Sequence, residues 1–309
     1  MKMKNIFLTF LLTLVTMISS YAQKENLSSE ELLRVAYISQ YDNTAREYFV
    51  YLPKGYSNNP NKKWPILMFL HGNGERGNGT DELDYVMIHG PLYEAWVQKR
   101  DLPFIMIVPQ LHMFDMEKLG IDYINGRSTD WIPKRLKNGV PERPQPEISQ
   151  ENFTGTIAND SIPSREFILK YGWNNVQEDL MSMINKTLAD YNTDKNRIYL
   201  SGLSFGGYGT WYTASKNPNV FAAINPVVGY AYPELMKPIA DAKIPIWNIS
   251  GGKDTSVPAQ YFYTGINKLK ELGYHNIRLT VHEDTGHVET WRRVYGGQDI
   301  YDWLLNQSK

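Results

Sequence analysis

One serine of the chain stands between two glycines in a spacing that suits nucleophilic catalysis. The segment Gly202-Leu203-Ser204-Phe205-Gly206 follows an apolar run at 198–200 and precedes a predicted helix that extends to about residue 215. On a tight strand-to-helix turn, side chains two residues before and after the serine would collide, and glycine removes the collision. The pattern therefore predicts a nucleophile elbow that raises the hydroxyl of Ser204 above a sheet edge. A glycine-rich turn without catalytic function is the alternative.

A serine hydroxyl is a weak nucleophile unless an imidazole accepts its proton and a carboxylate orients that imidazole. Two later loops, each after a predicted strand, supply such groups. Asp254 follows the strand expected at 244–249, and His287 follows a glycine beyond the strand expected at 277–281. His282 is the rival base because it stands at the end of the same strand, and Asp254 could instead cap a turn or a helix. We predict that Ser204, Asp254 and His287 form a catalytic triad.

Acyl transfer also requires two N–H donors for the negative oxygen of the tetrahedral intermediate. One is expected from Phe205, directly after the serine. The other is expected from the glycine-rich loop at 71–77, where Asn73 is the candidate and Gly74 the alternative. This loop does not match the glycine patterns that bind nucleotide phosphates, and the sequence contains no His-Glu-x-x-His run or comparable metal-ligand cluster. We therefore expect no cofactor and no metal.

The elements that must position these groups alternate between strand and helix. Continuous apolar runs at 66–70 and 104–109 are typical of strands buried on both faces. Further strands are predicted at 33–39, 47–52, 222–228, 244–249 and 277–281, with the first two as an antiparallel pair. Helices are predicted at 91–98, from 175, at 259–272 and at 298–305. This order predicts an α/β fold with a mainly parallel central sheet and helices on both faces.

Residues 111–171 interrupt this alternation. A connection of about 60 residues is far longer than an ordinary one, which indicates a lid or cap rather than a simple loop. The stretch leaves the strand at 104–109 from its carboxyl end, where ligands bind in open α/β sheets. It also contains the aromatic residues Tyr123, Trp131, Phe153 and Phe167. We predict that Trp131 contacts the substrate; an insert that merely packs over the sheet edge is the alternative.

The first residues have the pattern of an export signal. Lys2 and Lys4 precede an apolar run at 6–18, and Ser20-Tyr21-Ala22 suits cleavage by a signal peptidase. We predict a signal peptide at 1–22, a catalytic domain at 23–309 and a periplasmic or extracellular protein without a stable membrane anchor. An uncleaved anchor helix is the alternative.

Composition limits the other possibilities. The chain has 309 residues, a formal net charge of -1 and 0 cysteines. Near-neutral charge gives no reason to expect a nucleic acid partner, and the lack of cysteine excludes disulfides and thiolate chemistry. The oligomeric state stays open.

Three stretches together, at 71–77, 197–211 and 286–291, resemble the alpha/beta-hydrolase superfamily. More narrowly, they look like its secreted esterase branch, with feruloyl and acetylxylan esterases, polyhydroxybutyrate depolymerases and predicted prolyl-oligopeptidase-like peptidases. The resemblance covers roughly residues 45–110 and 173–306. It implies a serine hydrolase with Ser204, Asp254 and His287 as its triad. Glu75 and Arg76 match the usual Gly-Glu-Arg-Gly sequence of the branch and are expected to hold their loop.

These observations predict a secreted serine carboxylesterase that acts on acyl or aryl esters of polysaccharides or on small esters. Two alternatives remain. A serine peptidase of the prolyl-oligopeptidase-like type would use the same triad, but no propeller or other gating domain is evident in the sequence. A glycan-binding protein on a hydrolase scaffold would be expected to lack a triad member, and the sequence offers all of them.

Overall fold

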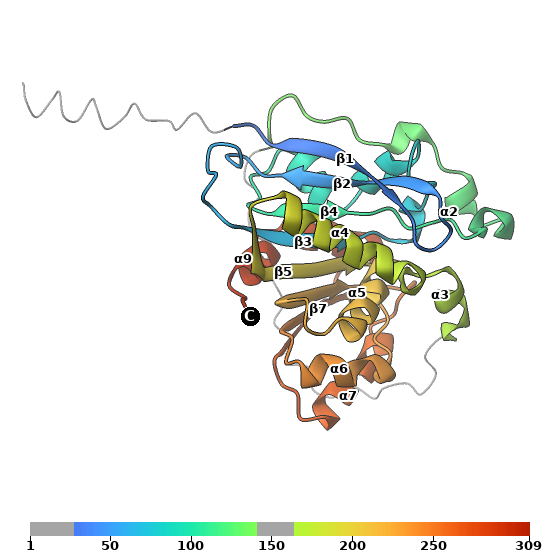
Figure 1. The fold of residues 1–309 in the computed structure, drawn as a ribbon. Helices are drawn as coiled ribbons and strands as arrows, with labels where there is room; N and C mark the ends of the chain where they lie inside the picture. Colours follow the sequence, from blue (N-terminus) through green and yellow to red (C-terminus); the bar gives the residue numbers. More distant parts are fainter. Residues whose placement is uncertain (1–27, 141–163) are drawn as a thin grey trace, which may run out of the picture.

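A computed structural model describes residues 28–140 and 164–309 (Figure 1). The predicted signal peptide at 1–22 and the aromatic Phe153 lie outside the described residues, so both expectations stay predictions. Eight strands form one sheet in the order β1-β2-β4-β3-β5-β6-β7-β8. Their bounds are β1 Glu31–Ile38, β2 Ala45–Leu52, β3 Trp64–Leu70, β4 Ile105–Val108, β5 Thr193–Leu203, β6 Ala223–Val227, β7 Ile246–Gly251 and β8 Ile277–His282.

The sheet is antiparallel at one edge and parallel through the rest. Strand β2 pairs antiparallel with both β1 and β4, whereas every pair from β4 through β3 to β8 is parallel. The predicted antiparallel opening pair and the predicted mainly parallel sheet are thereby confirmed. Parallel strands place all their carboxyl ends at one edge, which is where side chains from distant parts of the sequence meet.

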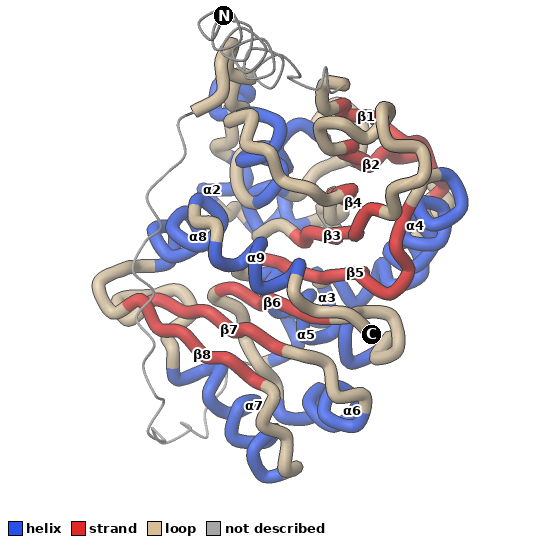
Figure 2. Tube along the Cα trace, turned by 90° about the vertical axis from the view of Figure 1, so that its left-hand side faces the viewer, coloured by secondary structure: helices blue, strands red, loops and turns tan. Residues whose placement is uncertain are grey.

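Side chains alternate between two cores because a strand points successive residues to opposite faces. In β3, Ile66 and Met68 belong to one core, and Leu67 and Phe69 to the other. Helices cover both faces, as predicted (Figure 2). The first core includes residues of α3 (Arg165–Tyr171), α4 (Gln177–Asp190), α5 (Phe205–Lys216), α6 (Met236–Asp241) and α7 (Gln260–Glu271), and the second includes residues of α8 (His287–Gly296) and α9 (Asp299–Leu305).

Two helical predictions differ from the structure. The helix expected at 91–98 is mostly a π-helical turn at Tyr93–Val97. Helix α8 was not predicted, and His287, expected in a loop, is its first residue. The signal for α8 was present, since residues Trp291, Val294 and Tyr295 are buried on one side of the helix at helical spacing.

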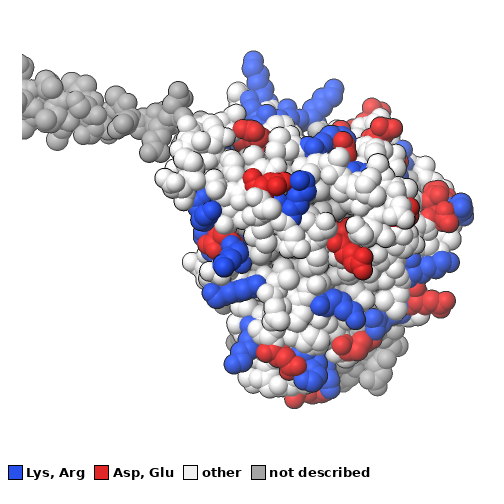
Figure 3. Space-filling model, in the orientation of Figure 1, with Lys and Arg blue, Asp and Glu red and all other residues white. Residues whose placement is uncertain are grey.

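The insert at 111–171 contains only short elements in its described parts, 111–140 and 164–171. They are η4 (Met116–Leu119), α2 (Asp122–Asn125), η5 (Thr129–Trp131) and α3. Each of them has at most 7 residues, which is too short for a periodic pattern to identify a regular element. On the face drawn in Figure 3, acidic and basic side chains are interspersed, in keeping with the near-neutral net charge.

Candidate active site

Ser204 occupies the turn between β5 and α5, as the glycine pattern predicts. Its backbone angles are φ 53° and ψ -116°, a strained conformation for a residue with a side chain. A Cβ on Gly202 would lie 2.3 Å from the carbonyl oxygen of Gly206, and a Cβ on Gly206 would lie 1.9 Å from that of Leu70. Only glycine fits at both places. The N–H of Ser204 donates to the carbonyl of Val227 in β6 at 2.9 Å, which fixes the turn to the neighbouring strand.

The three residues of the predicted triad lie in one hydrogen-bonded chain. Nε2 of His287 is 2.9 Å from Oγ of Ser204, and Nδ1 of His287 is 2.6 Å from Oδ2 of Asp254. The other oxygen of Asp254 accepts from the N–H groups of Ser256 at 2.9 Å and Val257 at 2.8 Å. Because an ionised carboxylate only accepts, Nδ1 carries the proton, and Nε2 is left to accept from the serine hydroxyl.

The rival base, His282, does not join this chain. It ends β8 as a buried residue, and its side chain lines a small separate cavity with Trp247 and Arg293. Burial lowers the pKa of His282 to about 4, so the imidazole is neutral at pH 7. The structure therefore brings His287, and not His282, to Ser204.

Two candidate oxyanion donors start helices on either side of Ser204. Phe205 is the first residue of α5, and Asn73 is the first residue of the 3-10 turn η1 (Asn73–Glu75). The first N–H groups of a helix have no acceptor within that helix. A Cβ on Gly72 would lie 3.6 Å from Cβ of Ser204, so this loop passes directly beside the nucleophile. The alternative donor, Gly74, is the second residue of η1.

Arg76 connects both of these donors, a role that the sequence did not reveal. Its side chain is 0% exposed and donates to the carbonyls of His112 at 2.8 Å and Tyr171 at 2.5 Å. Nε of Arg76 donates to Oδ1 of Asn73, and the guanidinium carbon lies 4.7 Å from the centre of the Phe205 ring.

Among the described residues, no carboxylate pairs with Arg76. Burial lowers its pKa to about 9, so keeping this group charged costs free energy. Among the described residues, this buried cation is held by carbonyl oxygens and by the rings of Phe114 and Phe205.

A second buried charge lies next to it. Glu75 is buried, and its Oε2 has no hydrogen-bond partner among the described residues. The imidazoles of His71 and His89 each approach its carboxylate to 3.7 Å. His71 also fixes the loop, because its Nε2 accepts from the N–H of Leu111 at 2.9 Å and its Nδ1 lies 2.6 Å from the carbonyl of Gly72.

A cavity of about 630 Å³ lies above the triad. Aromatic rings dominate its described lining, namely Tyr123, Trp131, Phe167, Phe205, Tyr230 and Trp291. The predicted contact residue Trp131 is among them, with 53% of its surface exposed. The insert therefore contributes to this cavity through Tyr123, Trp131 and Phe167, all of which the sequence analysis named among its aromatic residues. Such a cavity suits a planar or apolar group beside the reacting bond.

Within residues 28–140 and 164–309, no three His, Asp or Glu side chains are grouped as metal ligands would be. Over the same residues, none of the helices has the length and apolar character that crossing a bilayer requires.

The sheet order, the strand–turn–helix around Ser204 and the triad geometry define the class: the chain has the alpha/beta-hydrolase fold. Residues 166–247, which include the elbow, match the prolyl oligopeptidase family. A protein of Yersinia pestis that carries the name carboxymethylenebutenolidase is 29% identical over 131 residues, which are 37% of this chain and 49% of that protein. The matched part thus spans about half the length of this relative.

Solved structures agree on the fold. A thermostable esterase has 25% sequence identity and a TM-score of 0.58, and the match covers 90% of this chain and 63% of that one. A ferulic acid esterase from Anaeromyces mucronatus, of family CE1, has 14% identity, a TM-score of 0.53 and 93% coverage of both chains. An acylaminoacyl peptidase from Pyrococcus horikoshii has 13% identity and a TM-score of 0.53, with 92% of this chain and 43% of that one covered.

Proposed function

We propose that the chain is a serine esterase whose substrate carries a bulky, aryl-type acyl group. The observation that supports this most is the hydrogen-bonded chain from Ser204 through His287 to Asp254, placed beneath a cavity lined by aromatic rings. The resemblance to esterases, including one solved with ferulic acid, agrees with this choice.

The reaction would begin at Oγ of Ser204. As this oxygen bonds to the ester carbonyl carbon, its proton passes to Nε2 of His287. The buried carboxylate of Asp254 stabilises the imidazolium that forms. The carbonyl oxygen becomes negative and is met by the N–H groups of Phe205 and Asn73, which no helix hydrogen bond uses.

The tetrahedral intermediate would then break down to an acyl-enzyme. The bond from the carbonyl carbon to the alcohol oxygen breaks, and the alcohol leaves with the proton from His287. A water molecule next attacks the acyl carbon while His287 accepts its proton. The bond from that carbon to Oγ of Ser204 then breaks, His287 returns the proton to Oγ, and the acid is released. Trp131, Phe167 and Trp291 would hold the acyl group by contact with its ring or chain.

A panel of esters tests the proposal. The purified protein should hydrolyse a feruloyl or other aryl ester with a higher kcat/KM than an acetyl ester of the same alcohol, because only the aryl group fills the aromatic cavity. No hydrolysis of any ester by a folded protein would contradict the proposal. A preference for the acetyl ester would contradict the acyl-group assignment alone.

A second candidate is a serine peptidase. The match of residues 166–247 to the prolyl oligopeptidase family favours it specifically. The same triad would then cleave an amide, whose leaving amine needs the proton that His287 carries. A peptide amide with the same acyl group belongs in the panel, and a larger kcat/KM for the amide than for the ester would replace the esterase proposal.

We also propose that the protein is exported after cleavage behind Ala22, on the strength of the charged start, the apolar run and the small residues that follow. Amino-terminal sequencing of protein from its native host should find Gln23 first. A chain that still begins at Met1 would contradict export by this route.

A further inference from the structure

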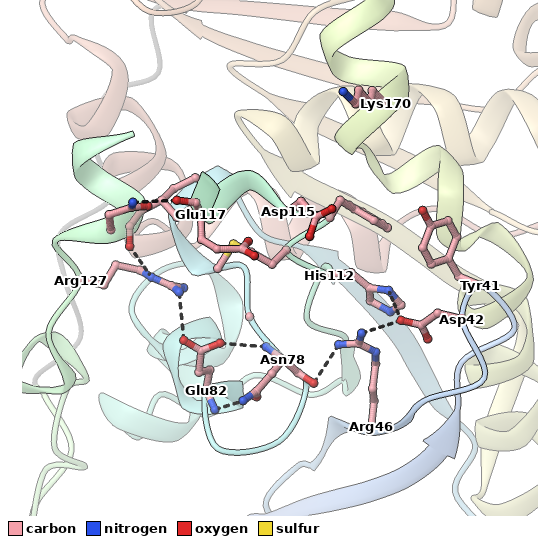
Figure 4. A pocket seen from close by; sticks show the side chains of 15 residues that line it. Tyr41, Asp42, Arg46, Asn78, Glu82, His112, Asp115, Glu117, Arg127 and Lys170 are labelled. Carbon is pink, nitrogen blue, oxygen red and sulfur yellow. Dashed lines mark hydrogen bonds and ion pairs between the residues drawn. The ribbon is translucent and has the colours of Figure 1, made fainter. Parts of the chain in front are cut away.

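The loop that borders the active-site cavity also borders a second one. Residues 72–75 line the cavity above Ser204, whereas Gly77 and Asn78 line a separate cavity of about 880 Å³ (Figure 4). The two sets of described lining residues have no member in common. The walls of this second cavity come from residues 41–46, 77–82 and 112–127 and from Lys170 of α3.

A continuous polar network lines its floor. Arg46 pairs with Asp42 at 2.9 Å and donates to the carbonyl of Asn78 at 2.8 Å. The N–H of Asn78 donates to Glu82 at 3.0 Å, and Glu82 accepts from Arg127 at 3.1 Å. Each of these charges therefore already faces an opposite charge. The network is formed without a ligand, so binding would not have to order it.

An exposed aromatic ring stands at one side of this network. Tyr41 is 52% exposed, and its ring meets those of Phe114 at 4.9 Å and His112 at 5.6 Å, edge to face. These contacts hold the tyrosine ring in place at the wall of the cavity (Figure 4). A fixed, exposed ring is a surface on which another ring can stack at low entropic cost.

The wall below Tyr41 holds an unsatisfied polar atom. His112 is 2% exposed, and its Nδ1 has no hydrogen-bond partner among the described residues; Oδ2 of Asp42 lies 3.8 Å away. Burial lowers the pKa of His112 to about 4, so the ring is neutral at pH 7 and offers hydrogen bonds rather than charge. This atom is shielded from solvent, so the hydrogen-bonding groups open to a ligand are those of the charged network.

We propose that this second cavity binds a neutral saccharide chain. A sugar ring would stack on Tyr41. Its hydroxyls, which both donate and accept, would form hydrogen bonds with the carboxylates and guanidinium groups of the network while the ion pairs between them stay intact. A ligand with net charge fits less well, because acidic and basic side chains line the cavity together and a charged ligand would lose its own hydration there.

Binding is tested separately from catalysis by using saccharides that carry no ester. Ser204→Ala protein is titrated by calorimetry with neutral β-1,4-linked xylose and glucose hexasaccharides. We expect saturable binding of at least one of them, weakened at least ~10-fold by Tyr41→Ala and largely kept by Tyr41→Phe, which retains the ring. Trp131→Ala, an equally exposed aromatic in the other cavity, is the matched control and should bind as before. Hydrolysis of a small acetyl ester should be unchanged in Tyr41→Ala protein that retains Ser204.

Three results would overturn the proposal. The first is no saturation by either hexasaccharide at about 10 mM, with the melting temperature showing a folded protein. The second is binding lost in Trp131→Ala but kept in Tyr41→Ala, which would place the sugar above the triad. The third is tighter binding of inorganic phosphate or of a glucuronate oligosaccharide than of the neutral chains, which would make the cavity an anion site.

Discussion

The two cavities on either side of the loop at 72–78 differ in the kinds of side chain that line them. The cavity above Ser204 is lined by several aromatic rings, and the triad groups beneath it are held in one geometry by their hydrogen bonds. The second cavity is lined by charged side chains of both signs, and four of them, Asp42, Arg46, Glu82 and Arg127, belong to a single network. Between them lies Arg76, whose side chain contacts the Asn73 side chain and the carbonyl of His112, one from each cavity.

This difference indicates what each cavity is suited to do. Acyl transfer depends on donors and acceptors placed where charge develops, and an apolar surrounding strengthens their effect. Side chains that already form ion pairs are poorly suited to stabilising a developing charge. They can still form hydrogen bonds of fixed geometry with a polar ligand. The following changes should therefore act on one cavity and spare the other.

The largest effect is expected from loss of the nucleophile. Ser204→Ala should leave the fold intact and reduce ester hydrolysis by at least about a thousandfold, because triad residues act as a unit. Turnover numbers and the melting temperature of the purified variant provide the measurement. Near-wild-type turnover by the folded variant would show that Ser204 is not the nucleophile, and the cavity above it would no longer be assigned to catalysis.

An almost equal loss is expected at the base. His287→Ala should reduce turnover about as much as Ser204→Ala, since only His287 touches the serine hydroxyl. His282→Ala is the matched control, because this buried histidine lies on the same strand-to-helix connection but outside the triad. Inactivation by His282→Ala and not by His287→Ala would reverse the assignment.

Asp254→Asn should reduce kcat by roughly a thousand- to ten-thousandfold with a smaller change in KM. The amide no longer compensates the imidazolium and can favour the wrong tautomer of His287. It should still accept from the N–H groups of Ser256 and Val257, so we expect the variant to melt near the wild-type temperature. A variant that loses substrate affinity instead of kcat would assign Asp254 to binding.

A smaller effect is expected at the residue between the cavities. Arg76→Met removes the contacts that hold Asn73 and the Phe205 ring, and we expect kcat to fall about 10- to 100-fold while KM changes little, since loss of one oxyanion donor costs 10²–10³-fold. The measurement separates kcat from KM and adds a thermal melt. Arg76→Lys should recover part of the loss. An unchanged kcat in folded Arg76→Met protein would limit Arg76 to a structural role.

The smallest and most selective effect is expected at Trp131. Trp131→Ala should raise KM for a bulky aryl ester several-fold and leave a small acetyl ester nearly unchanged, because only the larger acyl group reaches the ring. Tyr41→Ala is the matched control, equally exposed but in the second cavity. An equal loss on both esters with a lower melting temperature would support the alternative that the insert only packs over the sheet.

Local patterns made much of this molecule predictable. The apolar runs at 66–70 and 104–109 indicated buried strands, and the glycines around Ser204 indicated the turn, because both depend on neighbours in sequence. Parallel strands bring their carboxyl ends together, so the loops with Asp254 and His287 could be assigned to one edge without coordinates.

The contacts of Arg76 could not be predicted in this way. Its partners His112 and Tyr171 lie 36 and 95 residues further along the chain. Because every residue has a backbone carbonyl, the residue type does not show which carbonyl will accept the hydrogen bond. The second cavity is hidden for the same reason, since four separated segments line it. The sequence indicated only that Arg76, as part of a recurring motif, holds its own loop, and its contacts with Asn73 and Phe205 became visible in three dimensions.

The close packing of glycines around Ser204 also has a consequence for laboratory evolution. Alanine at Gly206 would place a carbon 1.9 Å from a carbonyl oxygen of β3, and alanine at Gly202 would meet the backbone of α5. A random library should therefore return almost no active variants at these positions, whatever substrate is selected. Variation in Trp131, Phe167 and their neighbours in the insert meets no such barrier, so new acyl-group preferences should arise there, with the catalytic turn inherited unchanged.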